Sequence, residues 1–383
     1  MTRRRAPGEG AVFERPDGRW EARLELRDLD GRRRRKSFYG RTQSEALAKL
    51  HQAQRQLDDG LPMVNERLTT GEYLEHWASV TMAPLLRPAT ADSYAALVRL
   101  HLKPFLGKVP LAKLTPEDVE CLLASKQRDG LSPNTVRLIR STLRRALGMA
   151  ERRGLVVRNV ATLVDGPRIG DSTRRAMTAE EARSLLEVSA DHRLGALFAL
   201  LLETGLRRGE ALGLLWQDVD LDGQSLNVCH TMIRVAGKLT AGEPKTRQSR
   251  RIVHFSGELA ATLRTHRRRQ LEERLSAGPG WHETGHVFAS STGTPLDPSN
   301  VRSAFAQLCQ RAALGHWTIH ELRHTAASLM LSAGVPLHVV SDVLGHSSIS
   351  ITKDVYGHLV ADDRERASEA ISSVLYRAGR AAR

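Results

Sequence analysis

The segment Thr204-Gly205-Leu206-Arg207-Arg208-Gly209-Glu210 decides the fold of this chain, together with three groups of residues that follow it. Those groups are Pro244-Lys245-Thr246, His320-Glu321-Leu322-Arg323-His324, and Leu344-Gly345-His346 with Tyr356-Gly357-His358. Each contains side chains that can donate hydrogen bonds to an anion or exchange a proton. The pattern around them predicts that one large C-terminal domain holds all four.

That domain, predicted over residues 169–383, is expected to be α+β and dominated by helices. The capping box Thr178-Ala179-Glu180-Glu181 opens its first helix. Hydrophobic periodicity then predicts strands at 217–222, 225–235 and 250–255, and helices at 194–203, 259–275, 299–313, 318–333 and 337–344. Lys245 falls in a turn between two strands. A linker rich in Gly, Pro, Asp and Ser precedes the domain at 166–173.

Residues 67–168 are predicted to form an all-helical domain. Thr115-Pro116 and Ser132-Pro133 each combine an N-cap residue with a proline at the first helical position. The helix that follows Ser132 carries Arg137, Arg140 and Arg144, spaced so that several share one face. This stripe predicts contact with phosphates, and a solvated helix face remains the alternative.

Residues 1–66 are predicted to form three short strands and a helix. The strands are expected at 10–15, 19–27 and 32–39, and the capping box Thr42-Gln43-Ser44-Glu45 opens the helix. The third strand begins with Arg32, Arg33, Arg34 and Arg35. An arginine-rich β-sheet fits the major groove of DNA, whereas an edge strand kept charged against aggregation is the alternative.

Composition points to a polyanionic partner without deciding it. The 383 residues carry a formal net charge of +14, which favours nucleic acid, although solubility or genome composition would also account for it. The longest apolar stretch, residues 194–202, is too short for a membrane span, and no apolar segment follows the basic N-terminus as in a signal peptide. The three cysteines lie far apart, which predicts a reducing, cytoplasmic location. A nucleic-acid partner would place the protein on the nucleoid.

Taken in this order and spacing, the four groups resemble the catalytic domain of the tyrosine recombinases, the integrase family of phages and integrative elements. The resemblance extends upstream over nearly the whole chain. It implies an AP2-like arm-binding domain at 1–66, a SAM-like core-binding domain at 67–168 and the catalytic domain at 169–383.

By this resemblance, Tyr356 is the nucleophile that forms a 3′-phosphotyrosyl intermediate, ten residues after His346. Arg207 and Arg323 clamp the scissile phosphate, and His346 adds a hydrogen bond to it. His320 takes the tyrosine proton, and Lys245 protonates the leaving 5′ oxygen. Glu210 is expected to brace Arg207 rather than to catalyse, and Tyr376 is the alternative nucleophile.

The resemblance also implies partners. It implies core and arm attachment sites in double-stranded DNA, a homotetramer on DNA, an excisionase and a DNA-bending host protein, with neither cofactor nor metal. Residues 361–375 have helical character and are expected to dock on a neighbouring protomer.

A zinc protease is a rival interpretation, because His320-Glu321-x-x-His324 matches the HExxH motif. A third ligand is missing where it would be expected: Ala327 and Met330 stand at the metzincin positions, and no Glu occurs between Glu321 and Glu365. The other rivals are a catalytically inactive DNA-binding protein and a type IB topoisomerase. A topoisomerase has no use for a second DNA-binding site such as the basic N-terminal sheet.

Overall fold

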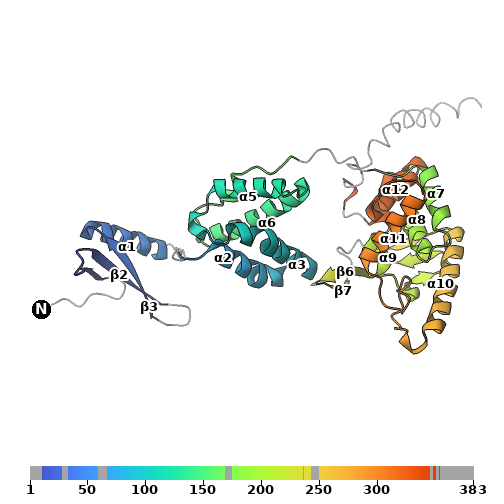
Figure 1. Cartoon of the computed structure of the whole chain (residues 1–383), viewed down its shortest axis with the longest axis horizontal. Coiled ribbons are helices and arrows are strands. Elements are labelled where there is room, and N and C mark those ends of the chain that lie inside the picture. Colours follow the sequence, from blue (N-terminus) through green and yellow to red (C-terminus); the bar gives the residue numbers. More distant parts are fainter. Residues whose placement is uncertain are drawn as a thin grey trace, which may run out of the picture. The chain divides into compact units, whose positions relative to one another are not determined.

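The chain forms two units, residues 1–170 and 171–383, in a computed structural model (Figure 1). The structure describes residues 11–27, 33–58, 67–168, 175–235, 237–242, 250–345, 348–350 and 353. Three large hydrophobic cores lie in these residues, two in the first unit and one in the second. The predicted fold class, α+β with several domains, is confirmed. The predicted boundary at residue 66 stays a prediction.

An antiparallel sheet opens the first unit, with strand order β1-β2-β3. Its strands are β1 (Ala11–Glu14), β2 (Trp20–Arg27) and β3 (Arg33–Gly40), and helix α1 (Gln43–Asp58) packs on β2 and β3. Alternation along β2 directs Ala22 and Leu24 toward α1, where they are buried with Ala46 and Leu50. The predicted three strands and helix are therefore observed.

A helical domain follows, with its own core. It contains α2 (Thr70–His76), a π-helix at Trp77–Met82, α3 (Pro88–Leu97), a second π-helix at Val98–Leu102, α4 (Lys103–Leu106), α5 (Pro116–Arg128) and α6 (Pro133–Arg152). The hydroxyls of Thr115 and Ser132 accept hydrogen bonds from the first turns of α5 and α6, as predicted. The phenol of Tyr73 donates to the carbonyl of Ala146 at 2.7 Å, and burial raises the pKa of Tyr73 to about 12.

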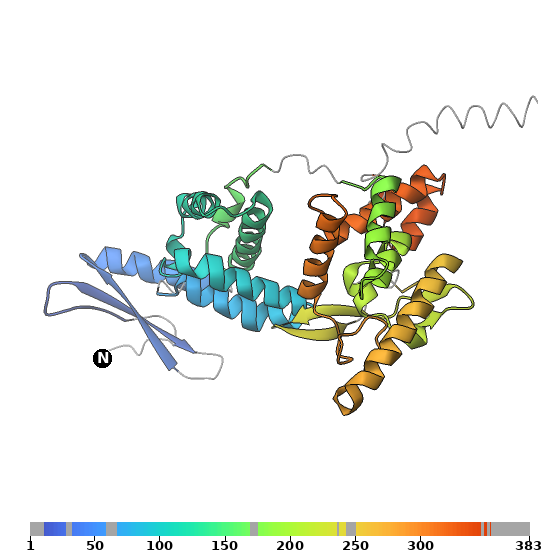
Figure 2. The ribbon, with the colours of Figure 1, turned by 45° about the vertical axis from the view of Figure 1, so that its right-hand side comes forward.

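The second unit is built mainly from helices around one core. These are α7 (Ala179–Ser189), α8 (Gly195–Thr204), α9 (Arg208–Leu212), α10 (Gly257–Ala277), α11 (Pro298–Arg311), α12 (Ile319–Ser332) and α13 (Leu337–Leu344). The most apolar of them, α8, contacts α7, α10 and α12 and supplies buried side chains on nearly every side. Figure 2 shows α10 as one long helix along a side of this unit.

Two small antiparallel sheets complete the second unit. One has the order β4-β5-β8, with β4 (Val219–Asp220), β5 (Ser225–Asn227) and β8 (Ile252–His254). The other is the hairpin of β6 (Thr231–Val235) and β7 (Lys238–Gly242). The prediction of one continuous strand over 225–235 is wrong. The chain leaves the first sheet at residues 228–230 and passes close to Gly213. A Cβ atom on Gly213 would lie 3.0 Å from the backbone of His230 and Thr231.

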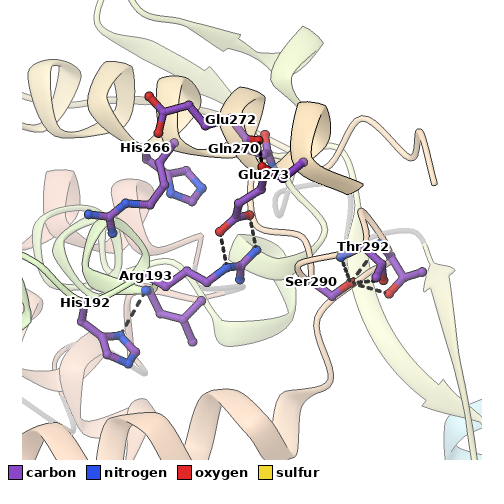
Figure 3. Close-up of polar contacts among 12 residues, drawn as sticks. His192, Arg193, His266, Gln270, Glu272, Glu273, Ser290 and Thr292 are labelled. Atoms are coloured by element: carbon purple, nitrogen blue, oxygen red, sulfur yellow. Dashed lines mark hydrogen bonds and ion pairs between the residues drawn. The ribbon is translucent and has the colours of Figure 1, made fainter. Parts of the chain in front are cut away.

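Polar side chains tie α10 to the loops beside it (Figure 3). Arg193, just before α8, makes two hydrogen bonds of 2.6 and 2.7 Å to the carboxylate of Glu273. The amide of Gln270 donates to the carbonyls of His286 and Val287. These contacts hold the helix against the core on both sides. Within the described part of the chain, no helix combines the length and the apolar character that crossing a membrane requires.

Candidate active site

Arg207 stands at the N-terminus of α9, directly after the turn that ends α8. Gly205 caps α8 in the left-handed conformation, with φ of 61°. The guanidinium of Arg207 donates to a carboxylate oxygen of Glu210 at 2.8 Å and to the carbonyl of Gly345 at 3.2 Å. The side chain remains 38% exposed, so it is fixed in direction and still open to a ligand.

Arg323 is buried in the first half of α12 and joins three segments. Its guanidinium donates to the carbonyl of Gly205 at 2.8 Å and to that of Leu344 at 2.7 Å. These carbonyls lie at the C-terminal ends of α8 and α13, where the helix dipole favours a cation. The two arginines therefore contact the same short segment, Leu344–Gly345, from different helices.

A buried carboxylate supports this arrangement. Glu210 accepts hydrogen bonds from the backbone and side chain of Arg207 and from Arg251, whose guanidinium also donates to the carbonyl of Val343 at 2.6 Å. Burial raises the pKa of Glu210, but the Arg251 charge and the Arg207 hydrogen bonds outweigh it and lower the pKa overall. These contacts between Glu210 and Arg207 support the predicted role of Glu210 as a structural brace, which stays a prediction.

The start of α12 exposes His320, one turn before Arg323. The rings of His320 and His324 meet edge to face, with their centroids 4.9 Å apart. Glu321 accepts a hydrogen bond from the backbone of Thr318 at 2.6 Å and pairs with Arg175 at 3.3 Å. In the HExxH interpretation this carboxylate would be a general base, but here it caps the helix and pairs with an arginine.

Arg175 fixes the loop before α12 in the same way. Its guanidinium donates to the carbonyl of His316 and lies over the ring of Trp317, 4.4 Å from the centroid. A cavity of about 390 Å³ opens beside this loop. It is lined by Leu206, Arg208, Arg302, Ala306, His316, Trp317, Thr318, Ile319, His320 and Arg323. The structure thus brings His320 and Arg323 to one cavity.

Three of the predicted catalytic residues, Lys245, His346 and Tyr356, lie outside the described residues. Strand β7 ends at Gly242, before Lys245, and the cap of α13 at Gly345 directly precedes His346. Arg207 and Arg323 contact Gly345 and Leu344, the last two described residues before His346. The described part of the site therefore ends at the peptide bond that joins Gly345 to His346.

The predicted DNA-binding arginines are distributed over the first unit. Arg32 lies outside the described residues, and Arg33, Arg34 and Arg35 lie on β3, where Arg35 is exposed and pairs in register with Glu25. On α6, Arg137 and Arg144 are exposed. Arg140 is half-buried, and its Nε donates to the carbonyl of Val164 at 2.5 Å, so part of its hydrogen-bonding capacity is used inside the domain.

Sequence reasoning missed the part that Arg251 plays. No role was assigned to it from the sequence, whereas its side chain is only 8% exposed and pairs with Glu210. The alternation of buried and exposed side chains along β8 could have predicted this burial. Val253 is buried and Ile252 is exposed, so Arg251, two residues before Val253, belongs to the inward face. Arg175 and Arg302 were also missed, and no sequence pattern singled them out.

Comparison with known proteins agrees with this site. The model of the phage integrase family matches residues 175–362, and that of the phage integrase N-terminal SAM-like domain matches residues 69–125. An integrase of Streptomyces ambofaciens is 33% identical over 93% of this chain and 94% of its own length. A tyrosine recombinase XerC-like protein of Caldanaerobacter subterraneus is 31% identical over 91% and 94%.

Solved structures share the fold. The Tn1549 transposon integrase, in complex with a circular intermediate DNA, has a TM-score of 0.67 at 21% identity, covering 79% of this chain and 99% of that one. A lambda integrase dimer bound to a core site has a TM-score of 0.56 at 20% identity, covering 93% and 97%.

The family that these relatives define is one of enzymes that recombine DNA at specific sites. Given identity above 30% over almost the full length of two relatives, the chain belongs to the tyrosine recombinase family, also called the phage integrase family. The resemblance recognised from the four sequence groups is therefore confirmed. The roles of the individual site residues stay predictions.

Proposed function

We propose that this enzyme is the integrase of a mobile DNA element and that it cuts and rejoins attachment sites through a 3′-phosphotyrosyl intermediate on Tyr356. One observation carries the proposal: Arg207 and Arg323, far apart in sequence, donate to adjacent carbonyls at Gly345 and Leu344. Two guanidinium groups therefore meet at Leu344 and Gly345, directly before His346 in the chain.

The two arginines would bind the scissile phosphate. Attack on a phosphodiester places negative charge on the non-bridging oxygens, and fixed cations lower the barrier by meeting that charge in place of water. Arginine suits the task because its planar fork donates two parallel hydrogen bonds to phosphate. Arg323 is held by carbonyls on one side, and Arg207 by Glu210, so neither fork needs to reorganise during the reaction.

The remaining residues would move the protons. The hydroxyl of Tyr356, with an ordinary pKa of about 10, attacks phosphorus while His320 accepts its proton. The bond from phosphorus to the 5′ oxygen breaks, and Lys245 donates a proton to that oxygen. His346 donates a hydrogen bond to the phosphate. One phosphodiester is replaced by another, so rejoining by the 5′ hydroxyl of a second strand needs no external energy source.

The same proposal covers the partners. The solved relatives include the Tn1549 integrase bound to DNA and a lambda integrase tetramer bound to a Holliday junction. We infer that this chain also forms a homotetramer on DNA, with the helical domain at core sites and the arginine-rich strand β3 at arm sites. An excisionase and a DNA-bending host protein would set direction, and the reaction would take place in the cytoplasm, on the nucleoid.

A nicked suicide duplex made from the DNA that flanks the gene tests the chemistry. The nick releases a short fragment after cleavage and traps the covalent complex. We expect wild-type protein in EDTA to give a covalent protein–DNA band on a denaturing gel, and Tyr356→Phe to give none.

A band that persists in Tyr356→Phe would contradict the assignment of the nucleophile, and Tyr376→Phe is then the next variant. Absence of a band from wild-type protein that binds the same duplex tightly would contradict the proposed function. It would favour the alternative of a DNA-binding protein without catalysis.

A further inference from the structure

Arg208 and Arg302 line the same cavity as His320 and Arg323, and the proposed chemistry uses neither of them. Arg208 is the first residue of α9, directly after Arg207, and Arg302 lies on α11, which contacts α9 (Figure 1). None of the ten residues that line the cavity is acidic. Three arginines and no carboxylate therefore line the cavity beside His320.

Within the described residues, the charge of this pair is neutralised only in part. There, neither Arg208 nor Arg302 forms an ion pair or a hydrogen bond with a carboxylate. Asp297 is near, but its carboxylate already accepts from Ser299 and pairs with Arg234. Arg208 is exposed at the mouth of the cavity; partial desolvation and the positive charge of Arg302 lower its pKa, and the nearby carboxylate of Asp297 raises it. Asp297 balances this charge only in part, and a bound phosphate that accepts hydrogen bonds from both guanidinium groups would balance the rest.

The cavity has room for an anion besides the scissile phosphate. Its volume of about 390 Å³ corresponds to about a dozen water molecules at about 30 Å³ each. A phosphodiester has only two non-bridging oxygens. Of the about ten N–H donors of Arg207 and Arg323, four bond to Glu210, Gly345, Gly205 and Leu344, which still leaves about six for those oxygens. A second pair of forks therefore suits a second phosphate better than the first.

We propose that Arg208 and Arg302 bind a non-scissile phosphate of the cleaved strand, the one next to the scissile phosphate. This inference rests on the proposed function. The two arginines would be positioning residues: they would hold the strand so that the scissile phosphate, and not a neighbour, reaches Arg323 and His320. Phosphate contacts of this kind set the register of a protein on DNA without reading its sequence.

Ethylation interference tests the proposal directly, because ethylating one phosphate removes its charge. The protein is the full chain carrying Tyr356→Phe, which binds without cutting, and the probe is the duplex that flanks the gene. The variants are Arg208→Gln, Arg302→Gln and both together. Arg311→Gln is the matched control, because Arg311 is an exposed arginine on the same helix, α11, outside the cavity. The covalent complex of wild-type protein marks the scissile phosphate.

We expect ethylation of the scissile phosphate and of its neighbour to block binding by the parent protein. The double variant should tolerate ethylation at the neighbour only, and the slope of its salt dependence of binding should fall by about one, because one phosphate contact is lost. Arg311→Gln should show the parent pattern of interference.

Two results would overturn the proposal. In one, the double variant keeps the parent pattern; in the other, it loses interference at the scissile phosphate, which would place both arginines in the clamp. Arg302 is exposed, so Arg302→Gln still tests the proposal even if Arg208→Gln unfolds. A covalent band with an unchanged pattern would remove this phosphate site alone, whereas absence of any covalent band would remove the proposed function.

Discussion

The guanidinium of Arg323 donates a 2.8 Å hydrogen bond to the carbonyl of Gly205, which lies 118 residues earlier in the sequence. A second bond from the same fork reaches Leu344. One buried side chain thus sets the positions of the C-terminal ends of α8 and α13 relative to α12. The same residue is predicted to bind the scissile phosphate, so structural and catalytic functions meet in it.

Replacing each arginine by lysine should separate these two functions. Lysine keeps the charge but cannot span two carbonyls, so Arg323→Lys should slow covalent-complex formation at least about 100-fold and destabilise the fold by about 1–3 kcal/mol. Arg207→Lys should slow cleavage similarly with a smaller loss of stability, because Arg207 is partly exposed. Suicide-substrate kinetics and thermal unfolding measure the two effects. Equal losses of stability would contradict this assignment.

Ionisation of Glu210 should make the free energy of unfolding depend on pH. Its pKa is lowered in the folded protein from an ordinary value of 4.5, so the ionised form stabilises the fold at neutral pH. That contribution is fully present above the unfolded pKa and is lost as pH falls through the folded pKa. We expect Glu210→Gln to be less stable at pH 7 by about 3–5 kcal/mol, because Arg251 loses its buried partner.

The difference in stability between Glu210→Gln and wild type should therefore shrink as the pH falls below about 4.5. Urea unfolding at a series of pH values measures it. A difference that stays constant down to pH 3 would show that Glu210 is not ionised in the folded protein.

Two glycines in the left-handed conformation provide a matched pair for the packing around α8. A Cβ on Gly205 would lie 2.5 Å from a methyl of Leu344, whereas one on Gly334, with φ of 84°, meets nothing within 4 Å. Gly334→Ala should cost about 1–2 kcal/mol from the backbone alone. Gly205→Ala should cost about 1–3 kcal/mol more through overpacking, and should slow cleavage as well. Equal losses would mean that the Leu344 contact relaxes freely.

Glu321 distinguishes the recombinase from the zinc protease. Because it caps α12 and pairs with Arg175, Glu321→Gln should lower stability by about 1 kcal/mol and leave most DNA cleavage intact. A protease would lose its general base and all activity with it. Cleavage of the suicide duplex and of a casein substrate, each with and without chelator, decides between them.

The arginines of α6 should differ in what they do. Arg137 and Arg144 are exposed, so replacing both by Gln should lower the salt slope of DNA binding by about two without altering stability. Arg140→Gln should instead destabilise the helical domain, by about 1–2 kcal/mol, because the carbonyl of Val164 loses its donor. An unchanged salt slope in the double variant would favour the alternative of a solvated helix face.

Local signals explain why much of the fold could be predicted. The caps at Thr115, Ser132 and Thr178 act within one helical turn, so a short sequence window contains both partners. Alternation along β2 needs only the residues of that strand. The family was recognisable because its motifs are short and their order is kept.

Long-range contacts explain what could not be predicted. The break at residues 228–230 depends on Gly213, and the burial of Arg251 depends on Glu210 and Val343, which lie 41 and 92 residues away. Arg208 and Arg302 come together only because α9 and α11 pack against each other, and no short stretch of sequence predicts this. Lys245, His346 and Tyr356 lie outside the described residues, so their roles still rest on the motifs.

The contacts of Arg175 have a mechanical consequence. Arg175 is the first described residue of the second unit, and its guanidinium contacts His316, Trp317 and Glu321. These residues form the loop and the first turn that lead to His320. A displacement of Arg175 would therefore act on the wall of the cavity and on the start of α12, the helix that carries His320 and Arg323.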